Sequence, residues 1–111
     1  MGSLKELAGT ILELLYEWTV NEDIGRVSSE AIAEALEMPP GTEQELDRAL
    51  RYLQKKKFIE GMMVSRGKWK YIGLTREGSN VKDDKDKFRR SFGVEVGIPG
   101  VVKLKWEAEE R

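Results

Sequence analysis

The sequence contains no cysteine and no histidine among its 111 residues. Without cysteine there is no disulfide, no thiolate nucleophile and no thiolate metal site. Without histidine the chain lacks the commonest general base and the commonest metal ligand. Catalysis would have to rest on carboxylates, lysines or tyrosines, and no constellation of these residues stands out. We therefore expect a protein that is not an enzyme and that holds neither a metal nor another cofactor.

Long hydrophobic runs are also absent. The apolar stretch at the start of the chain is interrupted by Lys5, Glu6, Glu13 and Glu17. It therefore lacks the roughly 18–20 apolar residues of a membrane span and the core of a signal peptide. We expect a cytoplasmic protein that makes no membrane contact. Its length and its 40% of hydrophobic residues suit one modest core.

The charges are separated along the chain, although they almost cancel to a net −1. Residues 48–76 carry nine Lys or Arg side chains and one acid, which gives a net charge of +8. Residues 1–47 carry eleven acids against Lys5 and Arg26, which gives −9. A basic segment of this kind is typical of a surface that binds nucleic acid.

The first half of the chain predicts two helices. Apolar residues recur at helical spacing over residues 4–19, after a capping box formed by Ser3 and Glu6. A second helix begins after Ser28, a suitable N-cap, and ends at the Pro-Pro-Gly sequence of residues 39–41. Its inward residues are Ala31, Ile32, Ala35 and Leu36.

A third helix is predicted over residues 42–57. It begins at a second capping box, formed by Thr42 and Glu45. Its buried stripe consists of Leu46, Ala49, Leu50 and Leu53. The cations Lys55–Lys57 suit the negative end of the helix dipole, where they either remain solvated or bind a partner.

From Phe58 the apolar period changes from that of a helix to that of a strand. Residues 59–65 and 69–75 are rich in β-branched and aromatic side chains and predict a hairpin. The turn at residues 66–68 contains Gly67, which supplies the positive φ of a tight turn.

The hairpin side chains are expected to divide between the core and the solvent. Ile72 and Leu74 are predicted on the buried face, with Lys70 on that face near the tip. Trp69 and Tyr71 are expected to support the core, and stacking on a partner is the alternative.

The last third of the chain is less regular. Residues 79–91 are mostly charged and form either a short exposed helix or a charged linker. Apolar residues then alternate along residues 92–98 and 102–106. We predict a C-terminal β-extension over residues 92–111, either a hairpin or a long bent strand. Because a hairpin alone is marginal in water, this extension docks on the domain or on a second copy.

The order helix, helix, helix, hairpin over residues 4–78 resembles the winged helix-turn-helix domain. That domain is an α+β fold with a three-helix core and a β-hairpin wing. The resemblance is carried by Ala31–Leu36, Gly41–Thr42, Leu46–Leu53, Lys57–Glu60 and Tyr71–Gly78. The last segment is similar to the strand exit of MarR- and PadR-like bacterial and archaeal regulators. The resemblance implies a prokaryotic transcriptional regulator whose DNA-binding domain spans residues 1–78.

In such domains the third helix reads bases and the wing contacts phosphate. The resemblance therefore places helix 42–57 in the major groove and wing 65–70 on the DNA backbone. Arginines on this helix could bind guanine or phosphate, a glutamine could pair with adenine, and the first helical amides suit a phosphate oxygen. The DNA-binding residues that the resemblance implies are Thr42, Gln44, Arg48, Arg51, Tyr52, Lys55, Arg66, Lys68 and Lys70.

Three residues depart from the pattern of the family. Glu45 and Asp47 stand on the expected outward face, where regulators usually carry small polar or basic residues. Carboxylates there oppose phosphates, although an acid can accept a hydrogen bond from cytosine. Lys57 stands where the family often has a glycine before the wing.

Two functions of different classes follow. The first is a regulator that binds double-stranded DNA as a homodimer, since such proteins usually pair to read two half-sites. Helix 4–19 or the tail at residues 92–107 would supply the dimer contact. The alternative is a winged-helix adaptor that binds protein, motivated by the acidic first half, the two acids on the third helix and the apolar tail.

Overall fold

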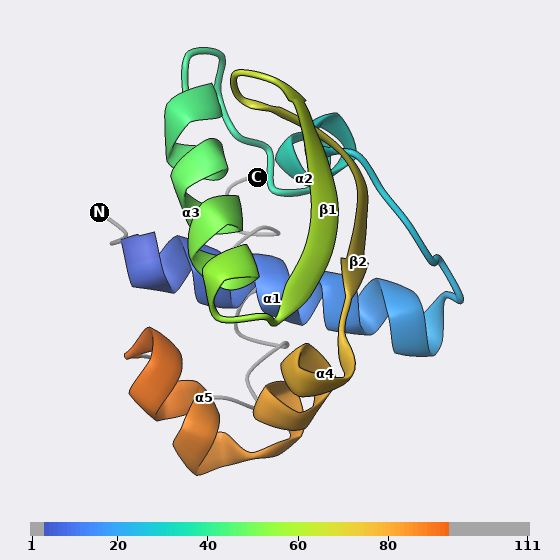
Figure 1. Ribbon diagram of the computed structural model, residues 1–111, viewed down its shortest axis with the longest axis vertical. Helices are drawn as coiled ribbons and strands as arrows, with labels where there is room; N and C mark the ends of the chain where they lie inside the picture. The colour runs from blue at the N-terminus through green and yellow to red at the C-terminus, as the bar shows by residue number, and fades with distance from the viewer. Residues whose placement is uncertain (1–3, 94–111) are drawn as a thin grey trace, which may run out of the picture.

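A computed structural model describes residues 4–93, which form an α+β fold with five helices and one two-stranded antiparallel sheet (Figure 1). The predicted order of three helices followed by a hairpin is confirmed. The elements are α1 (Leu4–Asn21), α2 (Ser29–Ala35), α3 (Glu43–Lys55), β1 (Ile59–Ser65), β2 (Lys68–Leu74), α4 (Arg76–Asp83) and α5 (Lys85–Phe92).

Helix α1 is the central element of the core. It lies against α3, α4, α5 and β2, and it crosses the middle of the molecule in Figure 1. Its middle turns are buried on a wide face that consists of Ala8, Gly9, Ile11, Leu12, Leu14 and Leu15. The helix predicted at residues 4–19 is therefore confirmed, with two more residues at its end.

Helices α2 and α3 begin in different ways. Ser28 caps α2 as predicted, because its Oγ accepts a hydrogen bond from the Ala31 amide at 3.2 Å. The capping box predicted at the start of α3 is wrong. Thr42 occupies the N-cap position, but its hydroxyl donates to the Pro39 carbonyl at 2.6 Å and caps no amide of the helix. The proline turn before α3 thus supplies a competing acceptor, which the sequence pattern did not reveal.

The buried stripe predicted for α3 is confirmed. Leu46, Ala49, Leu50 and Leu53 are all buried, and α3 packs on α1 through them. The helix ends at Lys55, and Lys57 then adopts a left-handed φ of 66°. This is the position at which glycine is common in the resembling family, and the lysine adopts the conformation that a glycine would favour.

Two β-bulges shape the hairpin. On β2, Tyr71 and Ile72 together oppose the single residue Gly61, and Tyr71 has a left-handed φ of 58°. The bulge lets both Trp69 and Ile72 point into the core although they are three positions apart. The core role predicted for Trp69 is confirmed, but that of Tyr71 is wrong, since this side chain is 61% exposed.

The bulge also changes the predicted faces of the second strand. Ile72 is buried and Leu74 is half-buried, as the pattern predicts. Lys70 lies instead on the outer face, opposite the exposed Met62, because the extra residue shifts the alternation by one. Val27 pairs with Ile72 in an isolated bridge, with N–O distances of 3.0 and 2.8 Å.

Residues 79–91, for which the sequence allowed either a short helix or a linker, belong to the two short helices α4 and α5, with Asp84 between them. Thr75 caps α4 by accepting from the Gly78 amide, and Asp84 caps α5 by accepting from the amides of residues 86 and 87. Phe88 and Phe92, one helical turn apart, are both buried in the same core as α1. Phe92 was predicted in the β-extension, and that assignment is wrong. The rest of the predicted extension, residues 94–111, lies outside the described residues.

Glu13 on α1 is half-buried, and this burial has a consequence for stability. Burial raises the pKa of its carboxyl above 4.5, and the charge of Lys82 partly offsets that rise. The folded protein therefore holds this proton more tightly than the unfolded chain does. Consequently the stability contributed by Glu13 is greatest below pH 4.5 and falls as the pH rises through the raised value.

We expect the change in the free energy of unfolding caused by Glu13→Gln to be more favourable at pH 7 than at low pH. At pH 7 the wild-type protein must bury an ionised carboxylate, whereas glutamine is never ionised. Urea unfolding of both proteins between about pH 3.5 and 7 measures the difference between their free energies of unfolding. The way this difference changes with pH tests the prediction, because any difference in packing is the same at every pH. A difference that stays constant across this range would contradict the assigned environment of Glu13.

Candidate nucleic-acid interface

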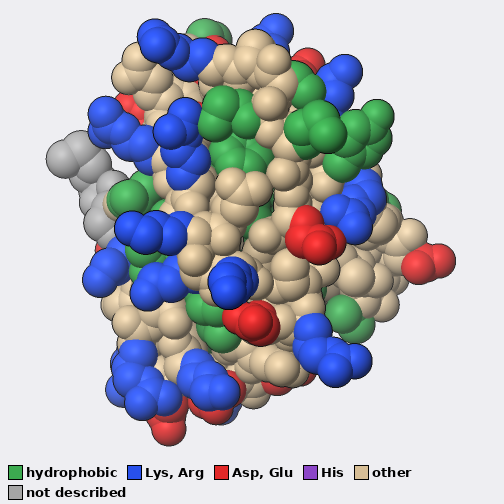
Figure 2. Space-filling view, viewed as in Figure 1, with side chains coloured by type: hydrophobic (Ala, Val, Ile, Leu, Met, Phe, Trp, Pro, Cys, Tyr) green, Lys and Arg blue, Asp and Glu red, His purple; other side chains and the backbone are tan. Residues whose placement is uncertain are grey.

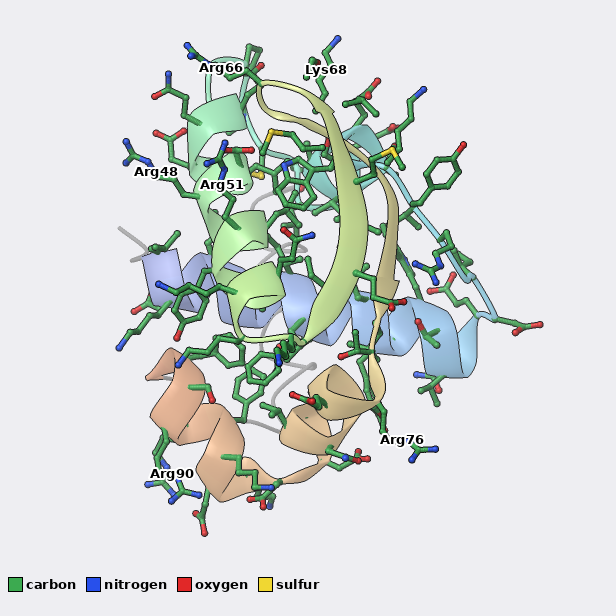
Figure 3. The ribbon with its side chains drawn as sticks, in the orientation of Figure 1. Arg48, Arg51, Arg66, Lys68, Arg76 and Arg90 are labelled. Carbon is green, nitrogen blue, oxygen red and sulfur yellow. The ribbon has the colours of Figure 1, made fainter. Side chains whose placement is uncertain are left out.

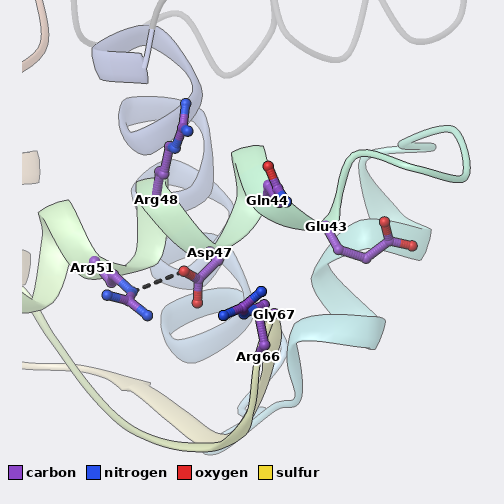
Figure 4. Close-up of a pocket in the computed structure, with 7 residues that line it drawn as sticks. All are labelled: Glu43, Gln44, Asp47, Arg48, Arg51, Arg66 and Gly67. Atoms are coloured by element: carbon purple, nitrogen blue, oxygen red, sulfur yellow. Dashed lines mark ion pairs between the residues drawn. The ribbon is translucent and has the colours of Figure 1, made fainter.

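A hollow of about 510 Å³ lies between the outward face of α3 and the tip of the hairpin (Figure 4). We call it the α3–hairpin groove. Helix α3 contributes most of its lining, and the tip contributes the remainder. The lining residues are Glu43, Gln44, Asp47, Arg48, Arg51, Arg66 and Gly67. Four of the residues predicted to bind DNA thus come together in one groove: Gln44, Arg48, Arg51 and Arg66.

Gly67 allows the tip to approach the start of α3. Its φ of 74° is the left-handed conformation that the sequence predicted for this turn. A Cβ atom built on it would lie 3.2 Å from Cβ of Glu43, so even a small side chain would crowd the helix. The glycine therefore brings Arg66 next to α3, although the two are far apart in the sequence.

Asp47 was predicted to face the solvent, and this prediction is wrong. It is only 9% exposed, and its carboxylate accepts a hydrogen bond from the indole Nε1 of Trp69 at 2.8 Å. The same carboxylate pairs with Nε of Arg51 at 2.8 Å. A buried tryptophan needs an acceptor for its N–H group, and this need was the signal in the sequence that could have identified Asp47.

The pair with Asp47 fixes the side chain of Arg51 beside the groove (Figure 4). Nε is used in this pair, and one terminal nitrogen lies 3.7 Å from the sulfur of Met63. The arginine side chain is still 58% exposed, so its remaining N–H groups can bind a ligand. Asp47 and Arg51 together neutralise each other, which weakens the repulsion that an isolated carboxylate would exert on a phosphate.

Arg48 and Arg66 supply the free positive charge of the groove. Both are exposed, and neither forms an ion pair with another residue of the described part of the chain. Arg66 reaches across the hollow toward Asp47, whereas Arg48 projects outward from α3 beside Gln44 (Figure 4). Three arginines against Glu43 and Asp47 give the lining a net charge of +1.

Tyr52, which the resemblance placed among the DNA-binding residues, does not line this groove. Its hydroxyl donates to the backbone carbonyl of Ser91 at 2.6 Å, and its ring meets that of Phe92 edge-on at 6.2 Å between centroids. Burial raises the pKa of the Tyr52 hydroxyl above 10.0. The side chain that was expected to face DNA is half-buried and packs against α5, an element that the sequence did not define.

The other predicted residues lie around the groove rather than in it. Thr42 is half-buried, with its hydroxyl committed to Pro39. Lys55 is exposed in the last turn of α3, away from the tip. Lys68 follows the tip and is exposed near Arg66 at the top of Figure 3, and Lys70 is exposed on the outer face of the hairpin.

An apolar patch on the outer face of the hairpin was not predicted. Met62 is 56% exposed, Val64 47% and Tyr71 61%. Met62 and Val64 stand on the outer side of β1, and the bulge adds Tyr71 to the exposed surface. A strict alternation of inward and outward side chains along β2 does not predict this patch, because nothing in the sequence indicates the bulge.

Within residues 4–93, no helix has both the length and the apolar character needed to cross a membrane. In the same residues no group of acids is arranged to hold a metal ion. Comparison of the chain with known protein families, with curated proteins and with solved structures finds no match.

Proposed function

We propose that this chain is a DNA-binding transcriptional regulator of the winged helix-turn-helix type. In this proposal α3 enters the major groove and the hairpin acts as the wing on the DNA backbone. The observation that carries the proposal is the convergence of Arg48 and Arg51 from α3 with Arg66 from the hairpin tip on one groove. Arginines are the side chains best suited to bind guanine edges and phosphates through paired hydrogen bonds.

The groove suggests separate roles for its residues. Arg48 and Gln44 project outward from α3, so they are the candidates for contacts with base edges. Arg66 and Lys68 at the tip would bind phosphate and fix the orientation of the domain. Arg51 is oriented by Asp47, and its terminal nitrogens would bind either a phosphate or a base edge. Glu45 is exposed, so of the two acids on α3 that depart from the family pattern it is the one that faces solvent.

A titration of the protein against random-sequence duplex DNA tests the proposal. Phosphate contacts by Arg51, Arg66 and Lys68 predict that log affinity falls with log salt, and they contribute a slope of about −2.7 per protein copy. A homodimer, which we also propose for the DNA-bound protein, would double this slope. Fluorescence anisotropy between about 20 and 300 mM salt measures it, and no binding at the lowest salt would overturn the proposal.

A second candidate function is a protein-interaction module. It is favoured by the apolar patch of Met62, Val64 and Tyr71 on the outer face of the hairpin. A bulky aromatic residue held at positive φ and exposed to solvent is unusual, and such conformations cluster at functional sites. If the titration shows no DNA binding, this patch is the surface to test by substitution of Tyr71.

A further inference from the structure

Helix α5 carries a second group of cations outside the α3–hairpin groove. Lys85, Lys87, Arg89 and Arg90 are all exposed, and the only acid within the helix is Asp86. Figure 2 shows basic side chains along one side of the molecule, from the upper part over α3 down to α5. In Figure 3, Arg90 lies below Arg48 and Arg51 on this same side.

Tyr52 connects α3 to α5, which also packs on α1 and α4. Its hydroxyl binds the carbonyl of Ser91, and the neighbouring Phe92 packs between the rings of Tyr52 and Phe58, with centroid distances of 6.2 and 5.9 Å. Phe92 is only 1% exposed. Arg90 adjoins Ser91, and Arg48 lies one helical turn from Tyr52. The two arginines are therefore held at a set separation by a buried joint.

The acid of α5, Asp86, neutralises only part of the positive charge around this joint. Arg89 pairs with Asp86 at 3.5 Å, but Arg90 forms no ion pair with another residue among those described. Nζ of Lys56 lies 5.8 Å from the centre of the Tyr52 ring, which adds a further positive charge beside α5. Like charges held together repel one another, so such a cluster favours a polyanionic partner.

We propose that α5 is a second phosphate-binding element, which contacts the DNA backbone beyond the α3–hairpin groove through Arg89 and Arg90. This proposal rests on the DNA-binding function proposed above. The hairpin tip and α5 lie toward opposite ends of the longest extent of the molecule, which is 36 Å (Figure 1). That length matches roughly one turn of duplex DNA, about ten base pairs. The α5 contact would thus lengthen the site occupied by each copy.

The test compares Arg89→Gln/Arg90→Gln and Arg90→Gln with the wild-type protein on a random duplex of about two helical turns. Each lost phosphate contact should reduce the salt slope by about 0.9 and weaken binding about eightfold at 0.1 M salt, with the curves converging near 1 M. Arg76→Gln is the matched control. Like Arg90→Gln, it removes one positive charge, but from an exposed position on α4, on the other side of the molecule in Figure 3. It should leave the salt slope unchanged.

The outcomes separate the two proposals. If wild-type protein binds and the double variant keeps both the affinity and the slope of Arg76→Gln, the role of α5 is wrong while the groove proposal stands. If wild-type protein does not bind, the proposed function itself is wrong. Tyr52→Phe gives a further readout, because it loosens the joint without removing charge. The effect of Arg90→Gln should then be smaller in the Tyr52→Phe background than in the wild-type background.

Discussion

Replacing Gly78 with alanine is expected to lower the free energy of unfolding by about 3 kcal/mol or more, at the upper end for overpacked sites. A Cβ atom at this position would lie 2.2 Å from the carbonyl oxygen of Phe58 and 2.8 Å from Cδ1 of Leu74. The Phe58 oxygen cannot move away easily, because it accepts a hydrogen bond from the Thr75 amide at 3.0 Å. Relief of the clash would therefore separate α4 from the junction between α3 and β1.

Gly25→Ala is the matched control for this prediction. A Cβ atom there meets no atom within 4 Å, so the change in stability should stay within about 0.5 kcal/mol. Urea unfolding of the two variants and the wild-type protein, followed by circular dichroism, measures both effects. If Gly78→Ala were no more destabilising than Gly25→Ala, α4 would not rest on the carbonyl of Phe58.

The segment Leu-Thr-Arg-Glu-Gly, residues 74–78, has a structural explanation in this protein. The Thr75 side chain accepts from the Gly78 amide to begin α4, and its hydroxyl also donates to the carbonyl of Lys57 at 2.6 Å. Gly78 then allows the close approach of α4 to Phe58. The residues that carried the family resemblance at the end of the hairpin thus connect β2, α4 and the end of α3. They lie away from the α3–hairpin groove.

Elements with a clear apolar period were predictable from the sequence. The stripe of Leu46, Ala49, Leu50 and Leu53 identified both the helix and its buried face. The turn at Gly67 was equally clear, because a tight hairpin needs a positive φ. The helices over residues 76–92 were not predictable in this way. They are held by a few anchors, chiefly Phe88 and Phe92, among many charged residues.

The candidate site was predictable where a residue's environment depends on its own helix alone. Arg48 and Gln44 face outward because they lie opposite the buried stripe of α3. Tyr52 and Asp47 also lie off the stripe, but elements distant in the sequence cover them. Ser91 and Phe92 meet Tyr52, and Trp69 binds Asp47. Tertiary contacts of this kind have no signature in local periodicity.

Removing both Arg48 and Arg66 is expected to have the largest effect on DNA binding. The Arg66 phosphate contact is worth a factor of about eight at 0.1 M salt, and the Arg48 base contact is worth about 1–3 kcal/mol. Arg48→Gln/Arg66→Gln should therefore weaken binding roughly fortyfold or more. The single variants should differ in kind. Arg66→Gln should weaken binding to all sequences alike, because a residue at the hairpin tip would touch only the backbone. Arg48→Gln should also reduce the preference for particular bases, because its side chain projects from α3.

The measurement uses a sequence that the wild-type protein selects from a random duplex library, together with a scrambled duplex of the same length. The ratio of the two affinities should fall for Arg48→Gln and stay constant for Arg66→Gln, with Arg76→Gln again as the charge control. Both arginines are exposed and form no ion pair with the described residues, so neither variant should alter the free energy of unfolding appreciably. If both variants bind like Arg76→Gln, DNA does not occupy the α3–hairpin groove. If Arg66→Gln alone changes the ratio, the assignment of reading to α3 and of backbone contact to the hairpin is reversed.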